Sequence, residues 1–60
     1  MKELVEREIK KIIKIFEENN YNKDDKINFL KCKLELATIY QNEIEVEACK
    51  SLMEHLEKTE

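Results

Sequence analysis

The sequence predicts an all-α fold, a compact three-helix bundle in up-down-up order that forms a single domain over residues 1–60. The chain has no Gly and no Pro, which make most tight turns, and this argues against a β-sheet protein. Charged residues make up 42% of the chain and are mostly Lys and Glu, which favour helices. The apolar residues, also 42%, recur with helical spacing in three segments and are too frequent for a disordered chain.

The first helix is expected over residues 2–18 and is amphipathic. Its basic residues lie on one side of a helical wheel, opposite the apolar ones. Asn19 and Asn20 follow it, and Asn tolerates the left-handed conformation that ends helices when Gly is missing. The apolar side, which is broad enough to face a core, consists of Leu4, Val5, Ile9, Ile12, Ile13, Ile15 and Phe16.

The second helix is expected over residues 25–40, with Asn22 or Asp24 as its N-cap. A helix that is apolar over most of its circumference is covered from more than one side. We therefore expect it to be the middle helix of the bundle or part of an interface between molecules. Its apolar positions are Ile27, Phe29, Leu30, Cys32, Leu34, Leu36, Ala37, Ile39 and Tyr40.

The third helix is expected over residues 43–58, after a break near Asn42. Asn42 and Glu45 have the spacing of a capping box. Without a break, the apolar arc would swing by about 120° between the two halves, and one partner surface could not cover both. The alternative is a two-helix hairpin whose second helix has roughly 35 residues. Such a hairpin could also form a dimer. The predicted core consists of Val5, Ile9, Ile12, Phe16, Leu30, Leu34, Ala37, Ile44, Ala48, Leu52 and Leu56.

Charge and composition restrict the classes of function. The net charge of −3 argues against generic nucleic-acid binding, which depends on neutralising phosphates. The start of the chain lacks the apolar region of a signal peptide, and no apolar stretch is long enough to span a membrane. We expect a cytoplasmic protein without membrane contact. The abundance of Lys, Ile and Asn follows AT-rich coding and points to a bacterial or phage source.

Residues that could carry chemistry are few. Sixteen residues separate Cys32 from Cys49, which is not a zinc-site spacing, and both fall in apolar arcs. We expect two buried thiols; a disulfide and a reactive thiol are the alternatives. His55 is the only histidine and has no recognised set of metal ligands around it. We therefore predict no enzyme activity, no catalytic residues, no cofactor and no metal.

The first helix carries a stripe of four basic residues, Arg7, Lys10, Lys11 and Lys14. Glutamates stand four residues from three of them, the spacing of surface ion pairs. We interpret the stripe as a solvated face. An acidic protein partner and nucleic acid are the alternatives, and the second of these is the runner-up function, a small nucleic-acid-binding helical hairpin.

Two segments resemble known families in part. Residues 34–56 resemble one tetratricopeptide helix pair in the placing of Ala37, Tyr40 and Ala48, without the motif's Trp, Gly and Pro. Residues 9–40 are similar in layout to the sporulation phosphatases that act on response-regulator aspartyl phosphates. That family's Ser-Gln-Glu-Leu-Asp signature falls on residues 31–35, where only Leu34 matches. No functional site is carried over from either family.

The breadth of the apolar arc on the second helix is the most informative feature. A monomer of this size is not expected to cover all of it, and exposed apolar patches mark interfaces. The sequence therefore predicts a small intracellular regulatory module that binds a larger protein sterically through a helix face, with a homodimer as another use of the same face. The predicted partner-binding residues are Phe29, Leu36, Ile39 and Tyr40.

Overall fold

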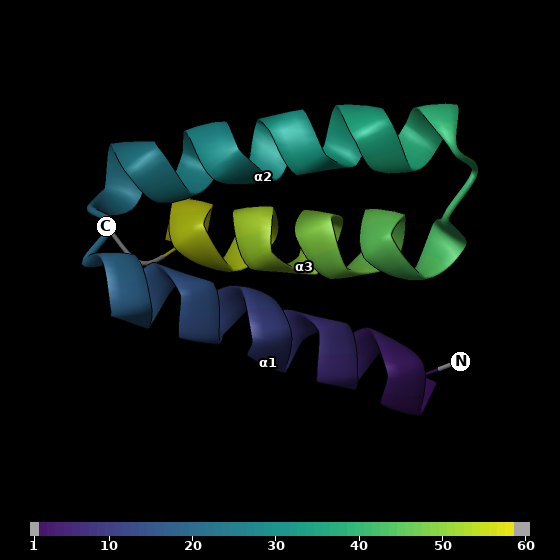
Figure 1. Ribbon diagram of the computed structural model, residues 1–60, viewed down its shortest axis with the longest axis horizontal. Coiled ribbons are helices and arrows are strands. Elements are labelled where there is room, and N and C mark those ends of the chain that lie inside the picture. Colours follow the sequence, from purple (N-terminus) through teal and green to yellow (C-terminus); the bar gives the residue numbers. More distant parts are fainter. Residues whose placement is uncertain (1, 59–60) are drawn as a thin grey trace.

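The computed structural model describes residues 2–58 and consists of three helices. They are α1 (Lys2–Asn19), α2 (Lys23–Ile39) and α3 (Glu43–Lys58). The chain runs up, down and up again through them, with short connections (Figure 1). The predicted three-helix bundle is confirmed, and the alternative with one long second helix is wrong because the chain turns between α2 and α3.

The middle helix of the bundle is α3. It lies between α1 and α2 and packs against both, whereas α1 and α2 make few contacts with each other (Figure 1). Of the two roles expected for the second helix, that of middle helix is therefore wrong, and that of an interface between molecules stays a prediction. Because α3 lies between α1 and α2, only one side of α2 packs against the bundle, and the remaining apolar surface of α2 is left uncovered.

The first turn ends α1 with a complete Schellman motif, in which a left-handed residue lets two N–H groups reach back to helix carbonyls. Asn20 is the left-handed residue, with φ at 53°. The Asn20 N–H donates to the Glu17 carbonyl at 3.4 Å, and the Tyr21 N–H donates to the Phe16 carbonyl at 3.2 Å. The prediction that Asn ends this helix in place of Gly is confirmed.

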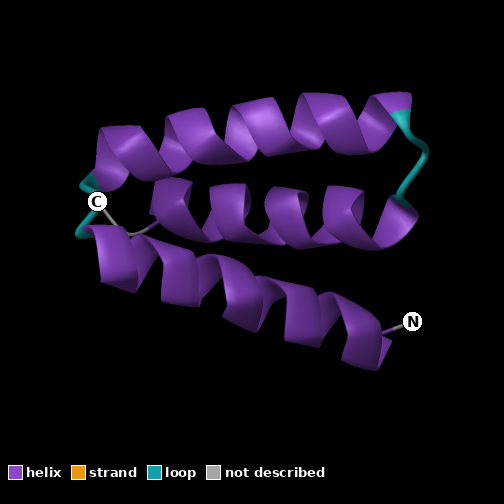
Figure 2. Cartoon of the chain, in the orientation of Figure 1, coloured by secondary structure: helices purple, strands orange, loops and turns teal. Residues whose placement is uncertain are grey.

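The second turn repeats the same motif at the end of α2. Gln41 takes the left-handed conformation, with φ at 57°. Its N–H donates to the Thr38 carbonyl at 3.2 Å, and the Asn42 N–H donates to the Ala37 carbonyl at 2.8 Å. Figure 2 shows that both connections are short loops between long helices. The same pattern of backbone hydrogen bonds therefore ends both α1 and α2.

Asparagine begins both of the helices that follow these turns. The Asn22 side chain accepts a hydrogen bond from the Asp25 N–H at 2.8 Å. The Asn42 side chain accepts one from the Glu45 N–H at 3.3 Å, and its Nδ2 donates to Glu45 Oε2 at 3.0 Å. The cap at Asn42 was expected from the sequence, and Asn22 was one of its two candidates for the cap of α2, the other being Asp24. Glu45 returns to the side chain of Asn42 and not to its backbone N–H.

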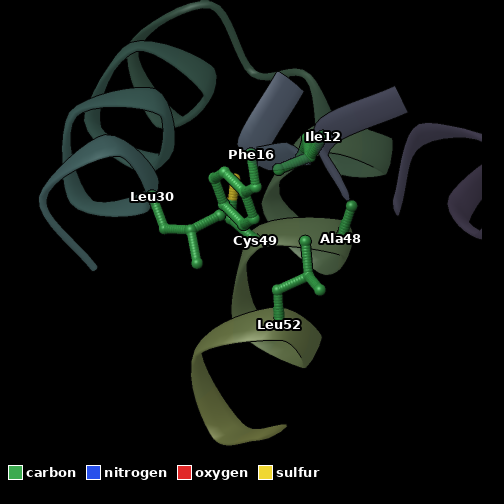
Figure 3. Packing of buried hydrophobic residues seen from close by; sticks show 6 residues of the cluster. All are labelled: Ile12, Phe16, Leu30, Ala48, Cys49 and Leu52. Atoms are coloured by element: carbon green, nitrogen blue, oxygen red, sulfur yellow. The ribbon is translucent and has the colours of Figure 1, made fainter. Parts of the chain in front are cut away.

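The core lies where α1 and α2 meet the two sides of α3. Figure 3 shows six of its side chains directed toward one another: Ile12, Phe16, Leu30, Ala48, Cys49 and Leu52. Ala37 is also buried. Of the predicted core, six residues are buried and five are only half-buried, because they lie at the margins of the helix contacts. These five are Val5, Ile9, Leu34, Ile44 and Leu56.

Candidate interaction face

One side of α2 presents large apolar side chains to solvent. Leu36 is 55% exposed, Ile39 72% and Tyr40 77%. Together with Phe29 and Cys32 on the same side of the helix, these residues are called the α2 face below. Three of the four predicted partner-binding residues are thus exposed, and the fourth, Phe29, is half-buried at the margin of the face.

The α2 face follows from the spacing of its residues. Phe29, Cys32, Leu36 and Ile39 are separated by three, four and three positions, which places them in one row along a helix. The residues that point into the core, Leu30 and Ala37, belong to a different row. The apolar arc of α2 therefore consists of two stripes, of which one packs on the bundle and the other is open.

Phe29 joins the α2 face to the core. Its ring meets that of Phe16 edge-on, with the ring centres 5.5 Å apart. Tyr21 completes an aromatic cluster at this end of the bundle, with its ring centre 6.2 Å from Phe29 and 6.0 Å from Phe16. The Lys26 ammonium lies 5.8 Å from the centre of the Phe16 ring, within the range of a cation–π contact. The beginning of the α2 face is therefore rigidly supported.

An ion pair holds α2 against α3 beside the face. Lys33 Nζ lies 2.7 Å from Glu45 Oε1. The hydrogen bond to Glu45 raises the pKa of the Lys33 ammonium, against the opposing effect of partial burial. The sequence pattern does not indicate this pair, because Lys33 and Glu45 come close only once α2 and α3 are placed side by side. Glu45 thus serves both the N-cap of α3 and the α2–α3 contact.

The two thiols lie in opposite environments and do not form a disulfide. Cys49 is buried in the core, as expected, and burial raises the pKa of its thiol, with the positive charge of Lys33 acting against this shift. Cys32 is exposed on the α2 face, so the expectation of a buried thiol is wrong for this residue. Cys32 was expected to be buried because α2 was a candidate for the middle helix. In the structure α3 is the middle helix and covers only one side of α2, so Cys32 stays exposed.

Charged residues of both signs lie on each side of the α2 face. On one side, Phe29, Cys32 and Leu36 border a shallow hollow that also includes Asp25 and Lys33. On the other side, Lys31 and Glu35 lie beside Ile39 along a second hollow. Within residues 2–58, neither Lys31 nor Glu35 forms an ion pair. The apolar row is therefore flanked by a positive and a negative side chain one turn apart.

The basic stripe lies on a different helix. Arg7, Lys10, Lys11 and Lys14 are all exposed on α1. In the described part of the chain the stripe forms one ion pair, between Lys11 Nζ and Glu8 Oε1 at 3.9 Å, and the pairs expected at four-residue spacing do not form. The stripe and the α2 face are therefore separate surfaces.

Two further features of the described surface bear on chemistry, an open groove and the exposed His55. A hollow of about 940 Å³ is an open groove in which Val5, Leu34 and Val46 contribute apolar side chains from all three helices. Over residues 2–58 no three His, Cys, Asp or Glu side chains gather in a way that could hold a metal ion, and His55 is exposed. No described helix combines the length and hydrophobicity that crossing a bilayer requires.

No protein-family model, curated protein or solved structure was found to match the chain. No family match therefore supports the partial resemblances to a tetratricopeptide helix pair and to the sporulation phosphatases. The case for a function rests on the chain's own surface, and above all on the α2 face.

Proposed function

We propose that this chain is a small regulatory module that binds protein through the α2 face. It acts sterically: the open side of α2 is laid against a larger protein, and the attached bundle blocks or bridges the surface that it covers. Leu36, Ile39 and Tyr40 are the proposed anchors, since large apolar and aromatic side chains supply most of the energy of such contacts. Phe29 supports them from the core side.

The observation that carries this proposal is the exposure of Leu36, Ile39 and Tyr40 together on the α2 face. Isolated exposed apolar residues are ordinary, but a continuous row of them is typical of an interface. The support beneath the row strengthens the case, because a rigid helix face loses little conformational freedom on binding. On α2 this support comes from Phe29 and from the Lys33–Glu45 ion pair.

The proposal includes a cytoplasmic location. An exposed, unpaired thiol such as Cys32 is compatible with a reducing compartment and is at risk of random oxidation outside one. Cys32 also lies within the α2 face, where a bound partner would cover it.

The proposal is tested with Leu36→Ala/Tyr40→Ala and a matched control, Leu4→Ala. Leu4 is also an exposed apolar residue, 44% exposed, but it lies on α1. We expect tagged wild type and the control to retain a protein from an extract of the source cell, and the double variant to lose it. The retained protein is then purified, and its affinity for each variant is measured by calorimetry.

Thermal unfolding, measured by circular dichroism, distinguishes a loss of binding from a loss of the fold. The double variant should unfold cooperatively, close to the wild-type temperature, because neither side chain is buried. Collapse of the fold would mean that the α2 face is part of the core, and equal binding by all three proteins would refute the proposed anchors.

A further inference from the structure

We propose that the α2 face is also self-complementary, and that in the free protein it is covered by a second copy of this chain, with the two α2 helices antiparallel about a two-fold axis. This inference deepens the proposed function and rests on it, since it uses the same face. The inference goes beyond the proposed function because it names what covers the α2 face in the free protein. The face is buried in a homodimer, which must dissociate before a larger target binds.

The location of α2 makes such a contact possible. α2 is an outer helix of the bundle, with α3 on one side and no helix on the other (Figure 1). A neighbouring α2 can therefore approach without any change in the fold. A two-fold dimer uses the same patch on both molecules, so the patch must match itself in shape and in charge.

The apolar row fits itself in an antiparallel arrangement. Its spacing is that of alternating a and d positions of a heptad, which allows side chains of two helices to form regular layers. The middle of the row lies between Cys32 and Leu36. With the two-fold axis there, Phe29 lies level with Ile39 of the second copy, and Cys32 lies level with Leu36 of the second copy. Each of the four side chains of the row thus meets another apolar one.

The charges beside the row favour the same arrangement. Lys31 and Glu35 lie on one flank, one turn apart, and neither has an ion-pair partner among residues 2–58. In an antiparallel pair this flank meets itself with reversed direction, so Lys31 of each copy lies about 3 Å along the axis from Glu35 of the other. The two Glu35 side chains come equally close to each other at the two-fold axis, and a lysine lies on either side of this pair. In a parallel pair, the flank with Lys31 and Glu35 would instead meet the opposite flank of the second copy. Lys33 on that flank is already bound to Glu45, so it is less available as a partner.

The α2 face is small, so the dimer should be weak and dependent on concentration. From Phe29 to Tyr40 the α2 face extends for about 16 Å along the helix, at about 1.5 Å per residue. An interface of this length belongs to the small class, which is typical of reversible association. Such a dimer gives way to a target with a larger matching surface.

The test measures mass against concentration, from about 1 µM to about 1 mM, by sedimentation equilibrium. The proteins are wild type, Lys31→Glu, Glu35→Lys and the double variant Lys31→Glu/Glu35→Lys. Each single change places like charges together twice across the two-fold axis, and should weaken the dimer about tenfold or more. The double variant restores opposite charges at both places and should dimerise like wild type. The control Lys10→Glu has the same change in net charge as Lys31→Glu, but it lies on α1 and should dimerise normally.

Oxidation with diamide tests the direction of the helices, because diamide takes up the electrons and protons of two thiols that join as a disulfide. A disulfide requires Cα atoms within about 7 Å. In the antiparallel dimer two copies of Cys32 lie too far apart to join, whereas Leu36→Cys places a second thiol level with Cys32 of the other copy. We expect dimers linked by disulfides from Leu36→Cys and not from wild type. Rapid linking of wild type through Cys32 would show a parallel arrangement and overturn the inference.

The outcomes separate this inference from the proposed function. A wild type that stays monomeric over the whole range, or a double charge variant that dimerises no better than the singles, refutes the antiparallel dimer. The capture of a target that Leu36→Ala/Tyr40→Ala loses would still support the proposed function in that case. Because Lys31 and Glu35 are exposed, the variants should fold, and circular dichroism at low concentration confirms this independently of dimerisation.

Discussion

Cys49 and Cys32 have the same side chain, but the fold gives them different chemistry. Cys49 is completely buried between the helices, and burial raises the pKa of its thiol above the ordinary value of 9.0. The thiolate is the reactive form, so a higher pKa and exclusion of reagent both slow its reaction. Cys32 is open to solvent on the α2 face.

This difference predicts two phases of thiol modification. In native protein at low concentration and pH 8, a disulfide reagent that releases a coloured thiolate should react rapidly with Cys32 and very slowly with Cys49. Unfolding in guanidinium should make the two rates similar. Cys32→Ala and Cys49→Ala assign the phases, and the rapid phase should be absent from Cys32→Ala. If both thiols react rapidly in the native state, Cys49 does not lie in a closed core.

At the scale of the single helix, the two turns show what replaces glycine in a chain that has none. Each helix that precedes a turn ends on a left-handed residue, which costs a residue with a Cβ atom about 1–2 kcal/mol. Asn20 bears this cost more easily than Gln41, because Asn enters the left-handed region more readily. Strain is therefore concentrated at the turn between α2 and α3.

We predict that Gln41→Gly stabilises the protein. The substitution removes the Cβ atom at a φ of 57° and should raise the free energy of unfolding by about 0.5–1 kcal/mol. For a domain of this size that corresponds to a rise of about 2–8 °C in the unfolding temperature. Asn20→Gly is the matched control at the other turn, with a smaller expected gain. A lower unfolding temperature for Gln41→Gly would show that the Gln41 side chain makes a stabilising contact.

The helices show how far sequence patterns reach. Asn supplied a signal at both N-caps and at the first left-handed position, so these features could be predicted from residue type. Gln41 gave no such signal, because Gln has no particular preference for a left-handed turn. Its conformation is set by the hydrogen bonds that end α2, which depend on where α3 must begin.

The α2 face shows a second limit of sequence patterns. Apolar residues occur almost all round α2, and nothing in the pattern separates the stripe at Leu30 and Ala37 from that at Leu36 and Ile39. The choice depends on which helix occupies the middle of the bundle, a property of the whole chain. The broad arc therefore indicated surplus apolar surface correctly, but could not place Cys32 inside or outside.

The bundle as a whole has a small core, with seven buried apolar residues in the described part of the chain. A chain of this length is expected to have a total stability of about 3–9 kcal/mol. Each buried side chain therefore represents a large share of that stability. The exposed apolar residues of α2 contribute little to it, which leaves them free to serve an interface.

A matched pair of leucines on α2 tests this division. Leu30 is completely buried and Leu36 is 55% exposed, and they lie six residues apart on one helix, so helix propensity changes equally in both variants. Leu30→Ala should cost about 2–5 kcal/mol, because it removes apolar contacts and leaves a cavity, and the chain should be largely unfolded near room temperature if its stability is at the lower limit. Leu36→Ala should cost about 1 kcal/mol or less in urea unfolding at low concentration.

At high protein concentration, the loss of stability caused by Leu36→Ala should be larger, because the dimer stabilises only protein that keeps the α2 face intact. Equal losses for both variants at low concentration would mean that Leu36 is as well packed as Leu30, and the α2 face would then not be free to bind.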